Sequence, residues 1–230
     1  MSKKINWSLI NAQTIETVNS YIYATSGTMK ECLATAKKAV ELAESDKAQV
    51  ILERDLCREE LVSGGMLLAD AIAESVRKFA DRLAQASSAL ADAESALETL
   101  QEKKRNALNK GLTVVPDSVY DAYKASARKV DVTAYVTATV EMLTAFGLTA
   151  TEVQTEKLAD TLSRWAGGMK RASGKAFEAG HRKTEQVKRT FKASMLDALV
   201  EYLIWEAKSF RYNEDKTALV LYTGEDKKAE

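Results

Sequence analysis

Hydrophobic residues recur with a heptad period along one segment of the chain, from Met66 to about Asn109. No glycine or proline interrupts these roughly forty residues. Apolar residues occupy two alternating seam positions: Ala69, Val76, Leu83, Leu90 and Leu97 at one, and Ile72, Phe79, Ala86, Ala93, Leu100 and Ala107 at the other. Alternating steps of three and four residues keep such a stripe facing a partner helix as two helices wind around each other. The sequence therefore predicts a long coiled-coil-like helix, packed either on another helix of the same chain or on a second copy of the protein.

Three shorter helical patterns precede this segment. Residues 7–26 place apolar side chains at helical spacing, and Gly27 is expected to end that helix. A second helix is predicted from Thr28 into the forties, and a third over residues 46–62, where apolar residues lie among charges. The glycine pair at 64 and 65 then predicts a hinge, so three helices are expected before the heptad segment.

Beyond Gly111 the pattern predicts further helices and one pair of short strands. Pro116 has the position of a helix start, residues 149–152 have the form of a capping box, and a final long helix is expected over 169–212. Residues 132–140 alternate with a period of two, which suits a strand, but the helical spacing that leads into them favours a helix. Residues 217–223 are the best strand candidate, and residues 112–115 are the expected partner strand.

Together these patterns predict a predominantly all-α protein, a multi-helix bundle with a long heptad-patterned helix and at most a minimal two-stranded β element. The composition agrees, because a chain of 230 residues with one proline and ten glycines has few interruptions between long elements. Hydrophobic residues form 46% of the chain, enough for a buried core. Three segments are distinguished and are expected to form one continuous domain: N-terminal helices (1–65), the heptad helix (66–110) and a C-terminal helical region (111–230).

The overall charge indicates no particular partner, since 33 basic residues balance 33 acidic ones. The first residues lack the uninterrupted apolar core of a signal peptide, and no stretch approaches the roughly 18 apolar residues that a membrane span needs. Cys32 and Cys57 have neither CxxC spacing nor a nearby histidine, so both are expected to be buried, reduced thiols. The sequence therefore predicts a cytoplasmic protein that does not span a membrane.

No motif in the chain indicates catalysis. His181 is the only histidine, and although Glu178 precedes it at metal-ligand spacing, a di-metal helical site needs a second copy of that motif. The segment from Gly168 to Lys175 fails as a phosphate-binding loop, because its glycine spacing is wrong, Ala176 stands where Ser or Thr is required, and no strand precedes it. We therefore expect a protein that is not an enzyme and that holds neither a metal nor a cofactor.

A local excess of positive charge lies between residues 164 and 192, where nine basic residues stand against two acidic ones. At about 100° per residue, four of the nine fall within about 40° on one helical face: Arg171, Lys175, Arg182 and Arg189. Such a basic stripe can follow a phosphate backbone or meet an acidic protein surface. Alternatively, glutamates four residues before Arg182 and Arg189 pair with them on a solvated face, or the helix packs near acidic helices of its own chain.

The leading functional hypothesis is a non-enzymatic helical binding protein that presents the basic stripe to nucleic acid or to an acidic surface of a protein partner. A second hypothesis is a structural or assembly subunit that forms a homo-oligomer through the heptad helix. A third is an inhibitor of a nucleic-acid enzyme, of the kind that phages and other mobile elements encode. This third hypothesis rests on how common such small proteins are and on no residue of the chain.

Overall fold

The computed structural model describes residues 12–122, 184–206 and 210–222. Over these residues the protein consists of helices and one two-stranded antiparallel sheet, which confirms the predicted all-α class with a minimal β element. The chain divides into two compact units. Residues 27–106 form one, which we call the hairpin unit, and residues 1–26 with 107–230 form the other, which we call the terminal unit.

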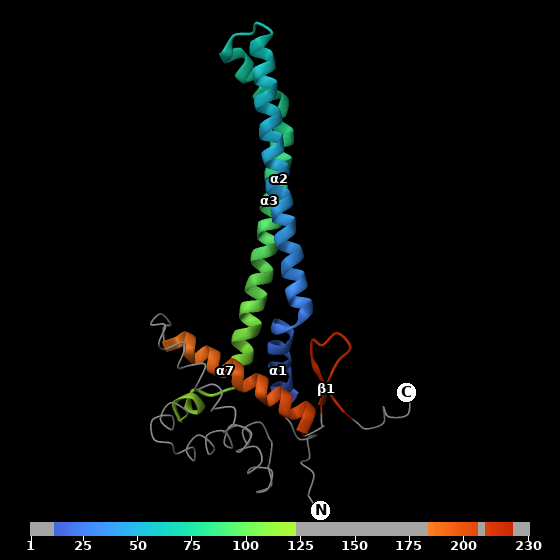
Figure 1. The fold of residues 1–230 in the computed structure, drawn as a ribbon, viewed down its shortest axis with the longest axis vertical. Coiled ribbons are helices and arrows are strands. Elements are labelled where there is room, and N and C mark those ends of the chain that lie inside the picture. The colour runs from blue at the N-terminus through green and yellow to red at the C-terminus, as the bar shows by residue number, and fades with distance from the viewer. Residues whose placement is uncertain (1–11, 123–183, 207–209, 223–230) are drawn as a thin grey trace, which may run out of the picture. The chain divides into compact units, whose positions relative to one another are not determined.

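The hairpin unit consists of two long helices that run side by side in opposite directions (Figure 1). They are α2 (Gly27–Ser63) and α3 (Leu68–Leu112), the last residues of which belong to the terminal unit. The antiparallel register is fixed by two contacts: Arg82 pairs with Glu53 at 2.8 Å, and Lys78 lies 3.9 Å from the sulfur of Cys57. One residue forward on α3 therefore corresponds to one residue back on α2.

Helix α2 is unbroken, so the prediction of two helices meeting near residue 46 is wrong. Its covered residues follow a heptad of their own, with steps of alternately three and four residues: Leu33, Ala36, Val40, Ala43, Lys47, Val50, Arg54, Cys57 and Leu61. Two charged residues stand in this seam and hide the period in the sequence. Lysine and arginine can occupy such positions because their aliphatic stems cover apolar surface while the charged ends reach water.

The heptad seam predicted on α3 is confirmed from Phe79 onwards, and it faces α2 of the same chain. Phe79 packs in a buried cluster with Val50 and Cys57, and Leu83 and Ala86 border that cluster. Before Phe79 the prediction is wrong. The buried positions there are Ala71 and Ser75, at 0% and 2% exposure, whereas the seam residues Ile72 and Val76 are 44% and 51% exposed.

The connection between α2 and α3 occupies residues 64–67, which confirms the predicted hinge. The amide of Gly64 donates to the carbonyl of Glu60, and Gly65 has φ +95°, a conformation that glycine adopts without steric cost. After this reversal the first turns of α3 bury Ala71 and Ser75 in place of the heptad positions Ile72 and Val76.

The core of the terminal unit forms around α7 (Thr184–Glu201), which continues into a short π-helix, η2 (Tyr202–Glu206). Apolar residues of α7 pack with α1 (Ala12–Thr25), with residues 114–120 and with the sheet. The buried members of this core are Val18, Tyr21, Ile22, Val114, Val115, Val119, Tyr120, Phe191, Met195, Leu196, Leu199, Val200, Leu203, Phe210 and Leu219. The core thus joins segments from both ends of the chain.

The sheet pairs β1 (Phe210–Tyr212) with β2 (Leu219–Leu221), and Arg211 stands opposite Val220. The strand predicted within 217–223 is confirmed, but its predicted partner is wrong, because residues 113–115 form turns that bury Val114 and Val115. The final helix also ends earlier than predicted, since residues 210–212 are extended. The turn predicted at 213–215 makes a local hairpin, whose closure costs less entropy than pairing with a strand about a hundred residues away.

The side-chain amide of Asn19 ties α1 to this hairpin. Its oxygen accepts a hydrogen bond from the backbone amide of Leu219 at 2.8 Å, and its nitrogen donates to the carbonyl of Leu219 at 3.4 Å. Within the turn, the side-chain oxygen of Asn213 accepts from the amides of Thr217 and Ala218. A two-stranded hairpin is marginal in isolation, so these bonds and the burial of Leu219 hold it in place.

Tyr21 makes a hydrogen bond within the terminal unit that depends on pH. Its hydroxyl donates to a carboxylate oxygen of Asp197 at 2.8 Å and lies 3.3 Å from the carbonyl of Ala193. Burial, together with the hydrogen bond and the charge of Asp197, raises the pKa of Tyr21 above its usual value of 10.0. Burial also raises the pKa of Asp197. The phenol therefore stays protonated in the folded protein at pH values where it ionises in the unfolded chain.

We expect Tyr21→Phe to lose about 1 kcal/mol of unfolding free energy near neutral pH, where it removes one partly buried hydrogen bond. Above about pH 10 the difference from wild type should shrink. There the unfolded wild type releases the phenolic proton and the folded state does not, so the contribution of Tyr21 is lost as pH rises. Urea unfolding of both proteins at about pH 8 and about pH 10.5 measures this. An equal difference in unfolding free energy between the two proteins at both pH values would contradict this prediction.

Other sequence predictions have mixed outcomes. Both cysteines are free thiols; Cys57 is buried as predicted, but Cys32 is exposed because it lies on the outer side of α2. In the described ranges no helix is long and apolar enough to cross a membrane. The predicted helix start at Pro116 is confirmed, since residues 117–122 are helical. The helices predicted between 123 and 183, including residues 132–140, lie outside the described residues.

Candidate functional site

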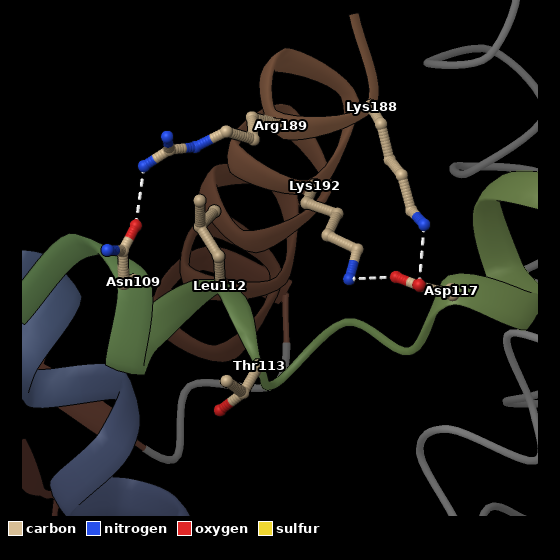
Figure 2. Close-up of a pocket in the computed structure, with 7 residues that line it drawn as sticks. All are labelled: Asn109, Leu112, Thr113, Asp117, Lys188, Arg189 and Lys192. Carbon is tan, nitrogen blue, oxygen red and sulfur yellow. Dashed lines mark hydrogen bonds and ion pairs between the residues drawn. The ribbon is translucent and has the colours of Figure 1, made fainter. Parts of the chain in front are cut away.

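Three cations converge at the beginning of α7 in the terminal unit. They are Lys188, Arg189 and Lys192. Together with Asn109 and Leu112 from the end of α3, and with Thr113 and Asp117 from the segment that follows it, they line a pocket of about 220 Å³. Figure 2 shows the three basic side chains extending from one helix toward Asn109 on one side and Asp117 on the other. The pocket is open to solvent along this row of polar groups.

An aromatic contact between two segments far apart in the sequence brings the two sides of the pocket together. Phe191 is buried among the basic residues of α7 and meets the ring of Tyr120 edge-on, with ring centres 5.4 Å apart. This contact holds the first half of α7 against the helix that begins after Pro116. Asp117 stands at the first turn of that helix, where the helix dipole favours a negative charge. Lys188 and Lys192 are one turn apart and face it together.

Asp117 is shared by the two lysines. The Nζ atoms of Lys188 and Lys192 each lie 2.5 Å from a different carboxylate oxygen of Asp117. The hydrogen bond from Lys188, followed by that from Lys192, lowers the pKa of Asp117 to about 2. The carboxylate is therefore ionised at any pH at which the protein would work. The lysine side chains are 21% and 15% exposed, and Asp117 itself is 58% exposed.

Arg189 has a different partner. Its guanidinium donates to the side-chain oxygen of Asn109, which is neutral, and the residue is exposed. The positive charge of Arg189 is therefore oriented by this bond but not neutralised by it. With three cations and one carboxylate, the described residues that line the pocket carry a formal excess of two positive charges.

The chemistry of this lining suits a small anion. Ammonium and guanidinium groups form strong charge-assisted hydrogen bonds to phosphate and carboxylate oxygens. A volume of about 220 Å³ is below the range of pockets that enclose a drug-sized molecule, so the site fits a single anionic group of a larger ligand. Among the described residues, no group of three or more His, Cys, Asp or Glu side chains is placed to hold a metal ion.

The structure places only part of the predicted basic stripe. Arg189 lies in the pocket, whereas Arg171, Lys175 and Arg182 lie outside the described residues, as do Glu178 and His181.

Two residues of the pocket were missed by the search for a stripe. Lys188 lies about 100° around the helix from Arg189, so a search for one face excludes it. The partner that brings Lys188 and Lys192 into the site is 71 residues from Lys188 in sequence. No local pattern signals such a contact. Asp117, an acid of the same chain, pairs with two cations of this helix that lie outside the predicted stripe.

Comparison with family models, with curated proteins and with solved structures finds no match for this chain.

Proposed function

We propose that the protein is a non-enzymatic binding protein, and that the pocket formed by Lys188, Arg189 and Lys192 holds a phosphate group of a nucleic-acid backbone. The observation that carries this proposal is the convergence of three cations on a pocket whose described lining contains one carboxylate. Like charges on adjacent turns repel one another, and folding alone does not require a third cation beside a pair that Asp117 already engages.

In the unbound protein, the carboxylate of Asp117 makes the bonds to Lys188 and Lys192 that a phosphate would make in the complex. It is more than half exposed, so it can move aside while a phosphate takes over its bonds to the two lysines. Arg189 contributes a charge whose present partner, Asn109, is neutral. Because the pKa of Asp117 is about 2, the competition between Asp117 and phosphate should not change between about pH 5 and pH 9.

The predicted stripe would lengthen this contact. Arg171, Lys175 and Arg182 precede the pocket in the same basic segment of the sequence. On a continuous helix these three residues would lie on the same face as Arg189, and each would add one phosphate contact. Phosphate contacts position a protein on nucleic acid without selecting a base sequence, so the proposal implies little sequence preference.

Charge reversal tests the proposal by fluorescence anisotropy of a labelled DNA duplex of mixed sequence. Arg189→Glu should weaken binding about tenfold or more at low salt, because it removes one phosphate contact and adds repulsion. Asp117→Asn should strengthen binding several-fold, since it removes the competing carboxylate from Lys188 and Lys192. The logarithm of the wild-type affinity should fall linearly with the logarithm of salt concentration, with a slope of about −0.9 per phosphate held.

Arg105→Glu is the matched control, because it changes the net charge equally at an exposed position of α3 outside the pocket. It should leave affinity close to that of the wild type. Circular dichroism of each variant checks that helical content is retained. Absence of binding by the wild type at low salt, or equal losses in Arg105→Glu and Arg189→Glu, would overturn the proposal. Tighter binding to poly-glutamate than to the duplex would assign the pocket to an acidic protein surface instead.

A further inference from the structure

Large apolar side chains are exposed around the turn of the hairpin unit. Most of the large exposed hydrophobic residues in the described part of the chain lie in this region: Leu52, Leu56, Val62, Met66, Leu67, Leu68, Ile72 and Val76. Leu67 and Leu68 are 74% and 60% exposed. Scattered apolar residues on a surface need no explanation, but a concentration of them within a short stretch of a hairpin marks a contact surface.

On α3 exposed apolar residues occupy one side of the first turns, although Phe79, which lies within the same arc, is turned toward α2 and buried. At about 100° per residue, six exposed apolar residues span about 140° of the helix: Leu68, Ala69, Ile72, Ala73, Val76 and Ala80. We call this surface the tip face. Ala71 and Ser75, which are buried, lie to one side of it and turn toward α2. In its first turns α3 contacts α2 through Ala71 and Ser75. The heptad residues Ile72 and Val76 therefore remain exposed.

The other edge of the tip face carries two opposite charges. Asp70 and Arg77 are seven residues apart, which places them within about 20° of each other around the helix. If two copies met in parallel along this face, this edge of one helix would lie beside the opposite edge of the other helix, so Asp70 and Arg77 would not meet. In an antiparallel pair this edge meets the same edge of the second copy, and Asp70 of one copy can stand opposite Arg77 of the other on both sides of the two-fold axis, with Ile72 within one residue of the level of Val76.

We infer that the tip face binds the tip face of a second copy of this chain in antiparallel orientation. Arg77 is 79% exposed and pairs with Glu74 of its own helix at 2.9 Å, so it can be shared with Asp70 of the second copy. A lipid surface suits the tip less well. The charged residues near it are Glu59, Glu60, Asp70 and Glu74 against Arg58, Arg77 and Lys78, so the tip has no positive excess that would attract an anionic membrane.

The interface is small, so association is weak and depends on concentration. Sedimentation equilibrium of the full chain between about 5 and 300 µM should show the mass rising from that of the 25.3 kDa monomer toward the dimer. Ile72→Lys should remain monomeric throughout this range, with unchanged helical content. Leu42→Lys is the control, because Leu42 is 66% exposed on α2 and lies outside the tip. It should associate as the wild type does.

A charge exchange tests the orientation. Asp70→Arg and Arg77→Asp should each weaken association several-fold, and the double variant should restore it. Residues seven apart on one helix cannot pair with each other, so restoration requires a second copy. A wild type that stays monomeric across the range overturns the inference and leaves the tip to a different protein or a lipid surface. Loss of association in Leu42→Lys but not in Ile72→Lys, or a double variant no better than the single ones, overturns it as well.

Discussion

Replacing Gly111 with alanine is expected to reduce the unfolding free energy of the terminal unit by about 2–3 kcal/mol. Gly111 is buried near the end of α3, where α1 crosses it. A Cβ atom at this position would lie 2.4 Å from the Cβ of Tyr21 and 3.1 Å from its Cα. A side chain can rotate away from a clash, but a backbone atom cannot. Helix α1 must therefore shift, and the shift disturbs the core around Tyr21.

The expected loss is net of an opposing effect, because alanine favours a helix over glycine by up to about 1 kcal/mol. Gly27→Ala separates the two effects. Gly27 begins α2, and an added Cβ there meets no atom within 4 Å, so this control should be neutral or slightly stabilising. Urea denaturation of both variants beside the wild type gives the comparison. Equal stability of Gly111→Ala and Gly27→Ala would show that α1 does not approach α3 this closely.

Phe79→Ala is expected to have the largest effect in the hairpin unit, a loss of about 3–5 kcal/mol. Phe79 is 8% exposed and packs against Val50 and Cys57, with Leu83 and Ala86 beside them. The guanidinium of Arg82 lies 5.3 Å from the centre of its ring and would lose that contact too. Truncation leaves a cavity between two helices that have few other large buried side chains, so the pairing of α2 with α3 weakens.

Val76→Ala is the informative control for Phe79→Ala. A regular heptad makes both residues seam positions, but Val76 is 51% exposed in the structure. Its truncation should cost less than about 0.5 kcal/mol when the protein is dilute enough to be monomeric. Hydrogen exchange of the α2 amides near Val50 reports the stability of the hairpin unit apart from the terminal unit. Similar losses in the two variants would show that the seam continues through Val76.

The helices of this protein were predictable because hydrophobic period and glycine position are local properties. The regular stripe from Phe79 to Ala107 identified most of α3, and the glycines at 64 and 65 identified the turn before it. Helix α2 was divided in error, since Lys47 and Arg54 interrupt its stripe although they occupy seam positions. A charged residue is tolerated in a seam where its charged end can reach water, and this depends on the packing of the neighbouring helix rather than on the local sequence.

The candidate site was predictable only in part, for a similar reason. The abundance of basic residues before residue 192 indicated an anion-binding segment, and Arg189 was correctly included in it. The pairing of Lys188 and Lys192 with Asp117 requires the contact of Phe191 with Tyr120, which joins positions about seventy residues apart.

By itself, the sequence determined the helical class, the long heptad helix, the turn at 64–65 and a strand near Leu219, because each depends on neighbours along the chain. Tertiary structure decided which surfaces those elements cover. It paired β2 with the adjacent strand β1 and placed α1 on Gly111. It also turned Ala71 and Ser75 inward, leaving Ile72 and Val76 in solvent. The physical reason is that burial is decided by the geometry of packed elements, and small differences in how a helix leaves a turn change which of its residues are covered.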